Sequence, residues 1–276
     1  MYTLDNKLVK LKELLEKHDH LGIAFSGGVD STFLLAFAAS LSSHLKVTGI
    51  TAVAPNFAPD EIEFARNFCE ENHISHQMVT LDFSQIEGLK ENSRERCYTC
   101  KKSIFTRLKS VAAEQGIFVL ADGTNLDDDF DYRPGKRALS ELGIISPLKQ
   151  AGLTKVEIRQ ALQSMGISIW NKPAYACLAS RIPYGDEITE EKLAAVYQVE
   201  KAIREAGFSQ VRVRHHGQVA RIEVMPEDMQ AFIEPENLKR IHQIALNAGF
   251  SFAALDLSGY KMGNMNHQID LMQKLD

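Results

Sequence analysis

The stretch GIAFSGGVDSTFLL, residues 22–35, places two adjacent glycines between an apolar run and the start of a helical pattern. The apolar run over 20–25 predicts a short buried strand, and the residues from 30 onward predict a helix. Gly27 and Gly28 let the backbone take positive φ and approach an anion closely. The amides that follow, at the start of the helix, direct partial positive charge towards a phosphate. The stretch therefore predicts a phosphate-binding turn at the end of a strand.

The polar residues of this turn narrow the kind of site. Ser26 and Ser31 can add hydroxyl donors to a bound anion. Asp30 would repel a bare phosphate, so it indicates a bound cation or an orienting role. The Gly-Lys-Ser/Thr ending of a Walker A loop is absent, and so is the Gly-x-Gly-x-x-Gly of dinucleotide-binding folds.

Strand and helix patterns alternate on both sides of the turn. Strands are expected at 20–25, 46–53, 75–83 and 117–123, and helices at 30–43, 58–72 and 103–116. This alternation is typical of a parallel sheet with helices on both faces. We predict an α/β fold, with a Rossmann-like domain over residues 1–184.

The pattern changes near residue 185. The sequence beyond it predicts helices at 189–207 and 235–249 and strands at 210–216, 218–225 and 252–257. We predict a smaller C-terminal α+β domain over 185–276, for substrate binding or oligomerisation.

Composition limits the class of protein. The 276 residues carry a formal net charge of -5, which argues against a protein that binds duplex nucleic acid. The first twenty residues predict a charged amphipathic helix rather than the apolar core of a signal peptide. No apolar run is long enough to span a membrane, so a cytoplasmic location is expected.

Three of the four cysteines suggest a metal or cluster site. Cys97 and Cys100 form a C-x-x-C pair at the start of a helix, where the helix dipole lowers thiol pKa values. Cys177 lies in a later loop. Three soft ligands suit a 4Fe–4S cluster in which one iron lacks a protein ligand and could hold a sulfide.

Two alternatives remain for these cysteines. A structural zinc ion would need a fourth ligand, which Cys69, His215 or His216 could supply. The C-x-x-C pair could also be redox-active or simply structural.

The segment SGGVDS resembles the PP-loop of the ATP pyrophosphatases, a superfamily that includes NAD and GMP synthetases and several tRNA thiolation enzymes. The resemblance implies that ATP is cleaved between its α and β phosphates to adenylylate an oxygen of the substrate. It further implies that a later strand end, LADGTNLDD, presents Asp122, Gly123, Thr124 and Asn125 to the nucleotide.

Four stretches together, AFSGGVDSTFLL, DYRPGKRA, CLASRIPYG and VRVRHHGQVARIEV, resemble the LarE family of pyridinium-3,5-biscarboxylic acid mononucleotide sulfurtransferases. The resemblance covers nearly the whole chain. It implies that ATP and Mg²⁺, the latter held indirectly through Asp30, activate a pyridinium carboxylate, and that sulfur is then installed to give a thiocarboxylate. The product serves in nickel-pincer cofactor biosynthesis.

The family supplies sulfur in two ways. One branch sacrifices an active-site cysteine, and the other is proposed to use a 4Fe–4S cluster held by three cysteines. Cys97, Cys100 and Cys177 place this chain with the cluster type. Ala176, rather than Cys177, aligns with the sacrificial position, which further disfavours that route.

The resemblance also implies roles for other residues. Cys177, Lys101 and Glu200 are expected to act in catalysis, with Lys101 neutralising phosphate. The residues expected to contact the substrate or its phosphate are Ser180, Arg181, Arg212, Arg214 and Arg133, the last with Asp129 and Asp131 beside it.

Rival functions remain. A tRNA thiolation enzyme would share the PP-loop and the three cysteines, but the acidic balance of the chain disfavours it. An amidating synthetase that uses ammonia would not need the cysteines, and an ATP-binding module without activity would release no pyrophosphate. The family resemblance implies a homo-oligomer, and the sulfur donor is unknown.

Overall fold

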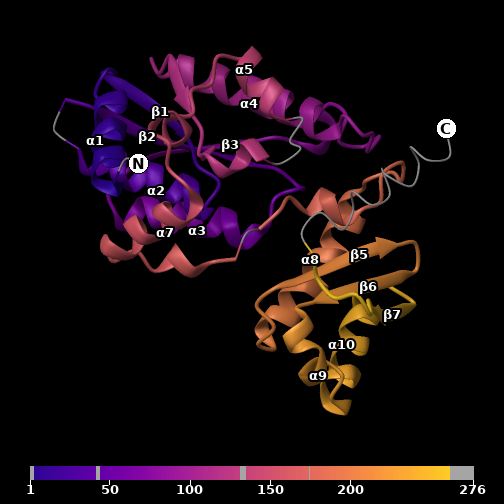
Figure 1. The fold of residues 1–276 in the computed structure, drawn as a ribbon. Helices are drawn as coiled ribbons and strands as arrows, with labels where there is room; N and C mark the ends of the chain where they lie inside the picture. The colour runs from indigo at the N-terminus through magenta and orange to yellow at the C-terminus, as the bar shows by residue number, and fades with distance from the viewer. Residues whose placement is uncertain (1–2, 42–43, 131–134, 174, 262–276) are drawn as a thin grey trace. The chain divides into compact units, whose positions relative to one another are not determined.

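The computed structural model describes residues 3–41, 44–130, 135–173 and 175–261. The chain divides into two compact units, each described by itself below (Figure 1). The first comprises Met1–Glu87 with Glu95–Tyr175, and the second comprises Gly88–Arg94 with Ala176–Asp276. The longer segment of the second unit thus begins at Ala176, ahead of the boundary that the sequence predicts near residue 185.

A four-stranded parallel sheet forms the centre of the first unit. Its strands, in the spatial order β3-β2-β1-β4, are β1 His20–Ala24, β2 Lys46–Val53, β3 Ser75–Thr80 and β4 Val119–Ala121. All three neighbouring pairs are parallel. The predicted α/β class with a parallel sheet is confirmed.

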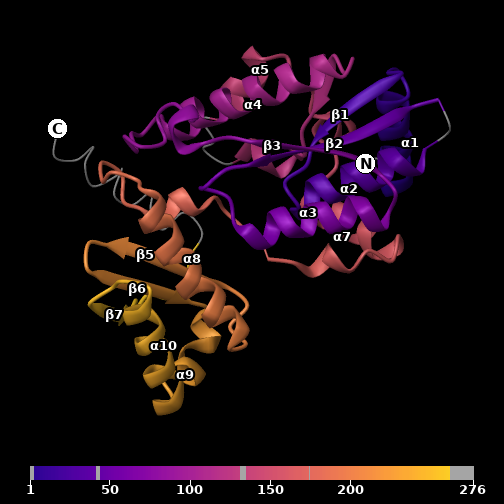
Figure 2. The same cartoon turned by 180° about the vertical axis from the view of Figure 1, so that it is seen from behind.

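Helices cover both faces of this sheet. They are α1 Leu4–Leu15, α2 Val29–Ser40, α3 Pro59–Glu71, α4 Arg96–Glu114, α5 Gly135–Glu141, α6 Pro147–Ala151 and α7 Lys155–Ser164. The chain moves from β1 through β2 to β3 in one direction and then returns to β4 on the other side of β1. Since such crossovers are right-handed, the return places α4 on the face opposite to α2 and α3, as Figures 1 and 2 show. No helix within the described residues is long and apolar enough to cross a membrane.

The core of the first unit lies between the sheet and α2. Leu21 and Ile23 of β1 and Phe33 and Leu35 of α2 are fully buried. The second helix is apolar on nearly every side because it packs against the sheet on one face and against α7 on the other. This burial holds the start of α2, and with it the turn before the helix, in a rigid frame.

The strand order creates a switch point beside β1. Connections leave β1 towards β2 on one side, while β4 lies on the other side with Leu21 opposite Val119. Open parallel sheets bind ligands at the carboxyl ends of strands that flank such a point. The turn after β1 and the loop after β4 therefore meet at the expected position of a ligand.

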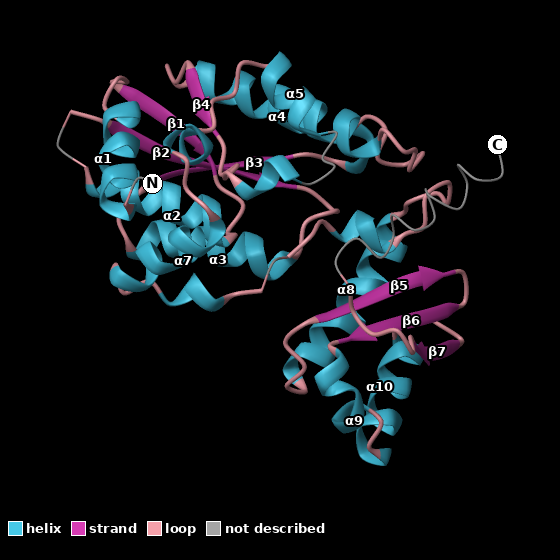
Figure 3. Cartoon of the chain, viewed as in Figure 1, coloured by secondary structure: helices cyan, strands magenta, loops and turns pink. Residues whose placement is uncertain are grey.

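The second unit is a smaller α+β fold (Figure 3). Its elements are α8 Glu190–Glu205, β5 Val211–His216, β6 Val219–Val224, α9 Met229–Phe232, α10 Pro235–Asn247 and β7 Phe252–Leu255. The sheet order is β5-β6-β7, with β5 antiparallel and β7 parallel to β6. Val199 and Ile203 of α8 and Val213 of β5 are fully buried where the helix packs against the sheet.

The segment Gly88–Arg94 belongs to this second unit because of Asn92. The Asn92 side chain is fully buried, and its amide donates to the backbone oxygens of Pro183 at 2.6 Å and Asp186 at 2.9 Å. The backbone oxygen of Asn92 accepts a hydrogen bond from the amide of Gly185 at 3.1 Å. These bonds fix the loop that leads into α8.

Candidate active site

The turn between β1 and α2 has the geometry of an anion cradle. Gly27 takes a φ of 73°, which side chains rarely adopt, and a Cβ there would lie 2.6 Å from the backbone oxygen of Glu61 on α3. Gly28 is the N-cap of α2, so the amides that follow it have no earlier turn of helix to bind. The predicted phosphate turn is therefore present, and α3 lies close against it.

Hydroxyl groups line the same turn. The Oγ atoms of Ser26 and Ser31 lie 3.1 Å apart, and Ser26 Oγ accepts a hydrogen bond from the Gly28 amide at 3.3 Å. Ser31 Oγ donates to the Gly28 oxygen at 3.2 Å. The side chains predicted to contact the nucleotide are thus gathered by the turn itself.

Asp30 lies in the first turn of α2 and pairs with a lysine. Its Oδ2 accepts a hydrogen bond from Lys155 Nζ at 2.5 Å, whereas its buried Oδ1 has no hydrogen-bond partner within the described part of the chain. Burial raises the pKa of the Asp30 carboxyl despite the opposing attraction of Lys155. A carboxylate oxygen without a hydrogen-bond partner in the described residues, beside a phosphate site, is a suitable ligand for Mg²⁺, directly or through water.

The loop after β4 packs directly against this turn. A Cβ at Gly123 would lie 2.9 Å from the amide nitrogen of Ser31, so only glycine lets the loop come so close to α2. Asp122 accepts hydrogen bonds from the hydroxyl of Thr124 and, at 2.6 Å, from that of Ser146. The structure therefore brings the predicted nucleotide residues Asp122 to Asn125 next to the turn.

Further along, the same loop connects to the start of α7. The Asn125 amide donates to Asp128 at 2.9 Å, and the Lys155 amide donates to Asp127 at 2.7 Å. Thr154 caps α7, and Glu157 reaches back to its amide at 2.8 Å. These contacts place the Lys155 side chain beside Asp30.

A second lysine lies on the turn. Lys172 Nζ donates to the Gly27 oxygen at 3.3 Å and pairs with Glu61 at 3.0 Å, and it lies over the ring of Phe64 at 5.3 Å. Sequence reasoning missed both Lys155 and Lys172. Neither has a local signal, because a lysine in a loop or at a helix start is usually exposed to solvent.

The C-x-x-C pair lies in the first turns of α4, as the sequence predicts. Cys97 is exposed and Cys100 is half-buried, and the Arg96 guanidinium lies 3.7 Å from the Cys97 sulfur. A Cβ at Gly135, the first residue of α5, would lie 2.8 Å from Cδ of Lys101, so α5 packs against the residue that follows the pair. Arg133 and Asp131 lie outside the described residues.

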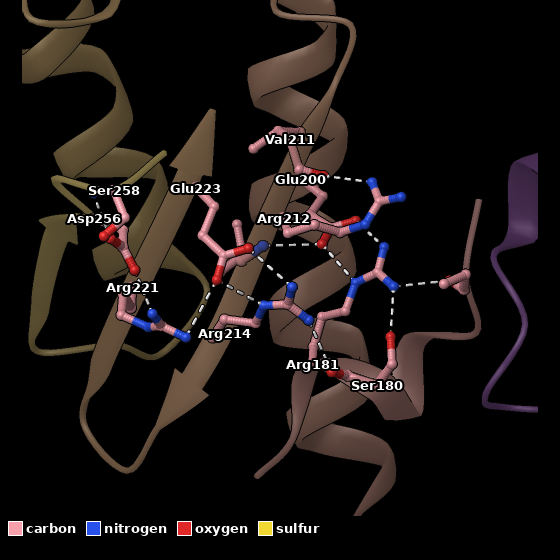
Figure 4. A network of polar contacts seen from close by, with 12 residues as sticks. Ser180, Arg181, Glu200, Val211, Arg212, Arg214, Arg221, Glu223, Asp256 and Ser258 are labelled. Carbon is pink, nitrogen blue, oxygen red and sulfur yellow. Dashed lines mark hydrogen bonds and ion pairs between the residues drawn. The ribbon is translucent and has the colours of Figure 1, made fainter. Parts of the chain in front are cut away.

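Cys177 belongs to the second unit, where a buried arginine holds its loop. Arg181 and Glu200 are both 0% exposed, and the guanidinium makes two hydrogen bonds to the carboxylate, at 2.8 and 3.0 Å. Its third nitrogen donates to the backbone oxygens of Ala176 at 2.8 Å and Cys177 at 3.2 Å. Figure 4 shows this network. Arg181 thus ties the backbone of the third cysteine to α8.

Burial and attraction oppose each other at Glu200. Burial would raise the pKa of its carboxyl, but the nearby Arg181 guanidinium and the Val213 amide, which donates to it at 2.9 Å, lower the pKa overall. Glu200 is therefore charged and compensated in the folded protein.

The neighbouring arginines of β5 are also engaged by protein groups. Arg214 makes two hydrogen bonds to Glu223, at 3.1 and 2.8 Å, and donates to the Ser180 oxygen at 3.0 Å (Figure 4). Arg212 donates to the Val211 oxygen at 2.7 Å and lies over the ring of Tyr260. The sequence predicts that Ser180, Arg181, Arg212 and Arg214 contact the substrate. In the structure they form one polar network around the Cys177 loop.

Within the described residues, no group of three or more His, Cys, Asp or Glu side chains is arranged to hold a metal ion. Cys97 and Cys100 belong to the first unit and Cys177 to the second. The two thiols of α4, three residues apart on one helix face, are suited to share one metal centre.

Comparison with known proteins identifies the family. Residues 2–132 match the PP-loop domain. The chain is 35% identical, over 99% of its length and 98% of the relative's, to the pyridinium-3,5-bisthiocarboxylic acid mononucleotide synthase of Lactiplantibacillus plantarum. The chain belongs to the LarE family. Family membership makes it an ATP-dependent sulfurtransferase, and the PP-loop domain supports ATP binding.

The chain is also similar to two uncharacterised proteins. A protein of Synechocystis sp. is 40% identical over 95% of this chain and 98% of the relative. A protein of Methanocaldococcus jannaschii is 30% identical over 92% of this chain and 97% of the relative. Both similarities extend well beyond the PP-loop domain, so they include the second unit.

Proposed function

We propose that the chain adenylylates the carboxylates of pyridinium-3,5-biscarboxylic acid mononucleotide and converts them to thiocarboxylates for nickel-pincer cofactor biosynthesis. The observation that carries this proposal is the 35% identity over 99% of the chain to a relative named for the bisthiocarboxylic product. A match confined to the PP-loop would leave the acceptor open, whereas this match extends through the second unit.

The first step is the attack of a substrate carboxylate oxygen on the α phosphorus of ATP. A bond forms between that oxygen and phosphorus, and pyrophosphate leaves with the electron pair of the broken bond. The turn amides and the hydroxyls of Ser26 and Ser31 hold the phosphates, while Asp30 orients Mg²⁺. Asp122 to Asn125 line the nucleotide site on the side opposite the turn, because Gly123 lies against Ser31.

The second step is the displacement of AMP by sulfide. A carbon–sulfur bond forms at the acyl carbon, and the bond from that carbon to the AMP oxygen breaks. Lys101 neutralises phosphate charge, and Glu200, Ser180 and the arginines of the second unit act on the substrate or hold the loop that carries Cys177. Arg133 is proposed as a further substrate contact.

We further propose that Cys97, Cys100 and Cys177 hold a 4Fe–4S cluster. Three thiolate ligands suit this group, and when bound it would offer one iron without a protein ligand as a site for an additional sulfide. Two of the three thiols already share one face of α4, and the backbone of the third is tied down by Arg181. Cys69 is the least suited of the four as a ligand, since burial raises the pKa of its thiol to about 12.

The first experiment measures iron, sulfide and zinc after anaerobic purification and cluster reconstitution. The variant in which Cys97, Cys100 and Cys177 are all changed to alanine is compared with Cys69→Ala as the matched control. About four irons per chain, lost in the triple variant and kept in the control, support the cluster. Stoichiometric zinc or no iron would contradict it, and dehydroalanine at Cys177 would identify a sacrificial route.

The second experiment tests the reaction. Pyrophosphate release and conversion of oxygen to sulfur in the product are followed with the pyridinium mononucleotide, ATP, Mg²⁺ and sulfide. The tRNA thiolation alternative predicts salt-sensitive tRNA binding instead, and the amidating alternative predicts activity with ammonia that survives loss of the three cysteines. The homo-oligomer and the cytoplasmic location stay predictions.

A further inference from the structure

The geometry points to Lys155 and Lys172 as the cations that bind the β and γ phosphates of ATP, each held ready beforehand by a carboxylate. Lys155 is paired with Asp30, and Lys172 is paired with Glu61. The inference deepens the proposed function, since it rests on ATP binding at the turn after β1.

The need for outside cations follows from the turn itself. Residues 26–31, SGGVDS, contain no lysine or arginine and carry one negative charge, at Asp30. A Walker A loop provides a lysine for the β and γ phosphates within its own motif, and this turn does not. Because the triphosphate is strongly anionic, the compensating charge must come from elsewhere in the chain or from a metal ion.

Lys172 is placed to supply part of that charge. Its Nζ lies 3.3 Å from the oxygen of Gly27, the residue whose positive φ shapes the turn. Its carboxylate partner, Glu61, belongs to the first turn of α3. The backbone oxygen of Glu61 also limits the space at Gly27. The side chain is 28% exposed, so the ammonium remains accessible to a ligand.

Lys155 reaches the turn from α7. Its Nζ lies 2.5 Å from Asp30 Oδ2 and its backbone amide is bound to Asp127, so both ends of the residue are fixed. The Lys155 side chain is 29% exposed. Lys155 and Lys172 are separated in sequence from their partners in the turn by 125 and 145 positions, respectively. The two ammonium groups nevertheless converge on one six-residue segment.

The two carboxylates hold the ammonium groups near the turn before ATP binds. Each ammonium is held near the turn by a single negative charge, and a bound triphosphate offers several. The lysines can therefore move from carboxylate to phosphate by small side-chain rotations, without being recruited from solvent. This preorganisation lowers the entropic cost of binding. Once Lys155 has turned to phosphate, Asp30 would be available to hold Mg²⁺, directly or through water.

The test measures the binding of ATP, AMP and pyrophosphate by titration calorimetry at fixed Mg²⁺ and ionic strength. Lys155→Met and Lys172→Met are compared with wild type and with Lys10→Met, an exposed residue of α1. We expect each variant to bind ATP and pyrophosphate about 10- to 100-fold more weakly, as for one lost charge-assisted hydrogen bond. AMP affinity should change less than about threefold, and Lys10→Met should match wild type.

A second variant separates ligand binding from a purely structural ion pair. Glu61→Gln keeps a side-chain oxygen that can hold Lys172 near the turn, but it removes a negative charge that competes with the phosphates, so pyrophosphate should bind more tightly than in wild type. If Lys172 only stabilises the fold through Glu61, then Glu61→Gln and Lys172→Met should weaken binding alike, which would overturn the inference.

Two further outcomes are decisive. Equal weakening of ATP and AMP in the lysine variants would contradict a role at the β and γ phosphates. Wild-type protein that binds neither nucleotide would contradict the ATP site itself, and with it the first step of the proposed function.

Discussion

The turn after β1 and the polar network of the second unit place charged and polar groups by different means. In the turn, Ser26, Gly27, Gly28, Asp30 and Ser31 lie within six residues of sequence, and the hydrogen bonds among them are local. In the network, Arg181 reaches Glu200 across 19 positions and Ser180 receives Arg214 across 34. A turn made by neighbouring residues can be recognised from sequence, whereas the pairings of a network assembled by tertiary packing cannot.

The two regions also differ in solvent exposure. The ion pairs beside the turn are partly exposed, with side-chain exposures of 17–29%, but Arg181 and Glu200 are both 0% exposed. Buried ion pairs make little net contribution, yet breaking one leaves an uncompensated charge in the interior. Changes in the network should therefore affect stability, and changes at the turn should mainly affect nucleotide binding.

The largest effect is expected from Glu200→Ala. Arg181 would be left buried without its carboxylate, so the free energy of unfolding should fall by about 3–5 kcal/mol. Urea denaturation measures the loss, and Glu205→Ala, at an exposed position near the end of the same helix, is the control, with a change within about 0.5 kcal/mol. A loss below about 1 kcal/mol for Glu200→Ala would mean that the network does not hold the second unit together.

A smaller loss is expected from Gly27→Ala. The positive φ costs about 1 kcal/mol for alanine, and the Cβ would press on the Glu61 oxygen, for a total of about 2–3 kcal/mol together with loss of ATP binding. Gly116→Ala is the matched control. Gly116 also has a positive φ, of 74°, but its Cβ would meet nothing within 4 Å, so about 1 kcal/mol and unchanged ATP binding are expected. Equal losses of unfolding free energy in the two variants would mean that the contact between residue 27 and the Glu61 oxygen of α3 has no effect.

The free energy of unfolding should also depend on pH through Glu200, by less than the loss expected from Glu200→Ala. Because the pKa of Glu200 is lowered on folding from its ordinary value of 4.5, its charge stabilises the folded state fully above about pH 4.5. That contribution is lost as the pH falls through the lower pKa of the folded state. The difference in unfolding free energy between wild type and Glu200→Gln should therefore be constant from pH 7 to about pH 5 and shrink below it. A difference that grows on acidification would reverse the sign of the predicted shift.

The smallest effect is expected at a helix cap of the first unit. Thr154→Ala removes the capping box that orients Lys155, which should cost about 1 kcal/mol by thermal or urea unfolding. Thr189→Ala removes the cap of α8, where Lys192 stands at the position that a glutamate takes in the capping box of α7, and should cost less. If ATP binding also weakens in Thr154→Ala alone, the cap contributes to the placement of Lys155.

Much of the fold follows from sequence pattern. Strands β1 and β2, helices α3, α8 and α10 and the strands of the second unit lie within two residues of their predicted ranges at each end, because each has a clear apolar period. The apolar pattern of helix α4 starts only at residue 103, but the helix begins at Arg96, where the C-x-x-C pair is expected to mark a helix start. The short helices α6 and α9 were missed because four or five residues cannot show a helical period.

The sequence by itself determined the phosphate turn and the family. Positive φ at Gly27, the N-cap at Gly28 and the flanking hydroxyls are local requirements, and each limits the residue types allowed at its position. The C-x-x-C pair at the start of α4 is likewise a local feature.

Only the tertiary structure decided which charges meet. Nothing near Lys155 or Lys172 in sequence predicts that they lie on the turn, since their partners are 125 and 145 residues away. The same holds for Arg181, whose sequence neighbours do not reveal that it is fully buried against Glu200. The physical reason is that a charged side chain pairs with the partner that packing brings within reach, and packing depends on the whole chain.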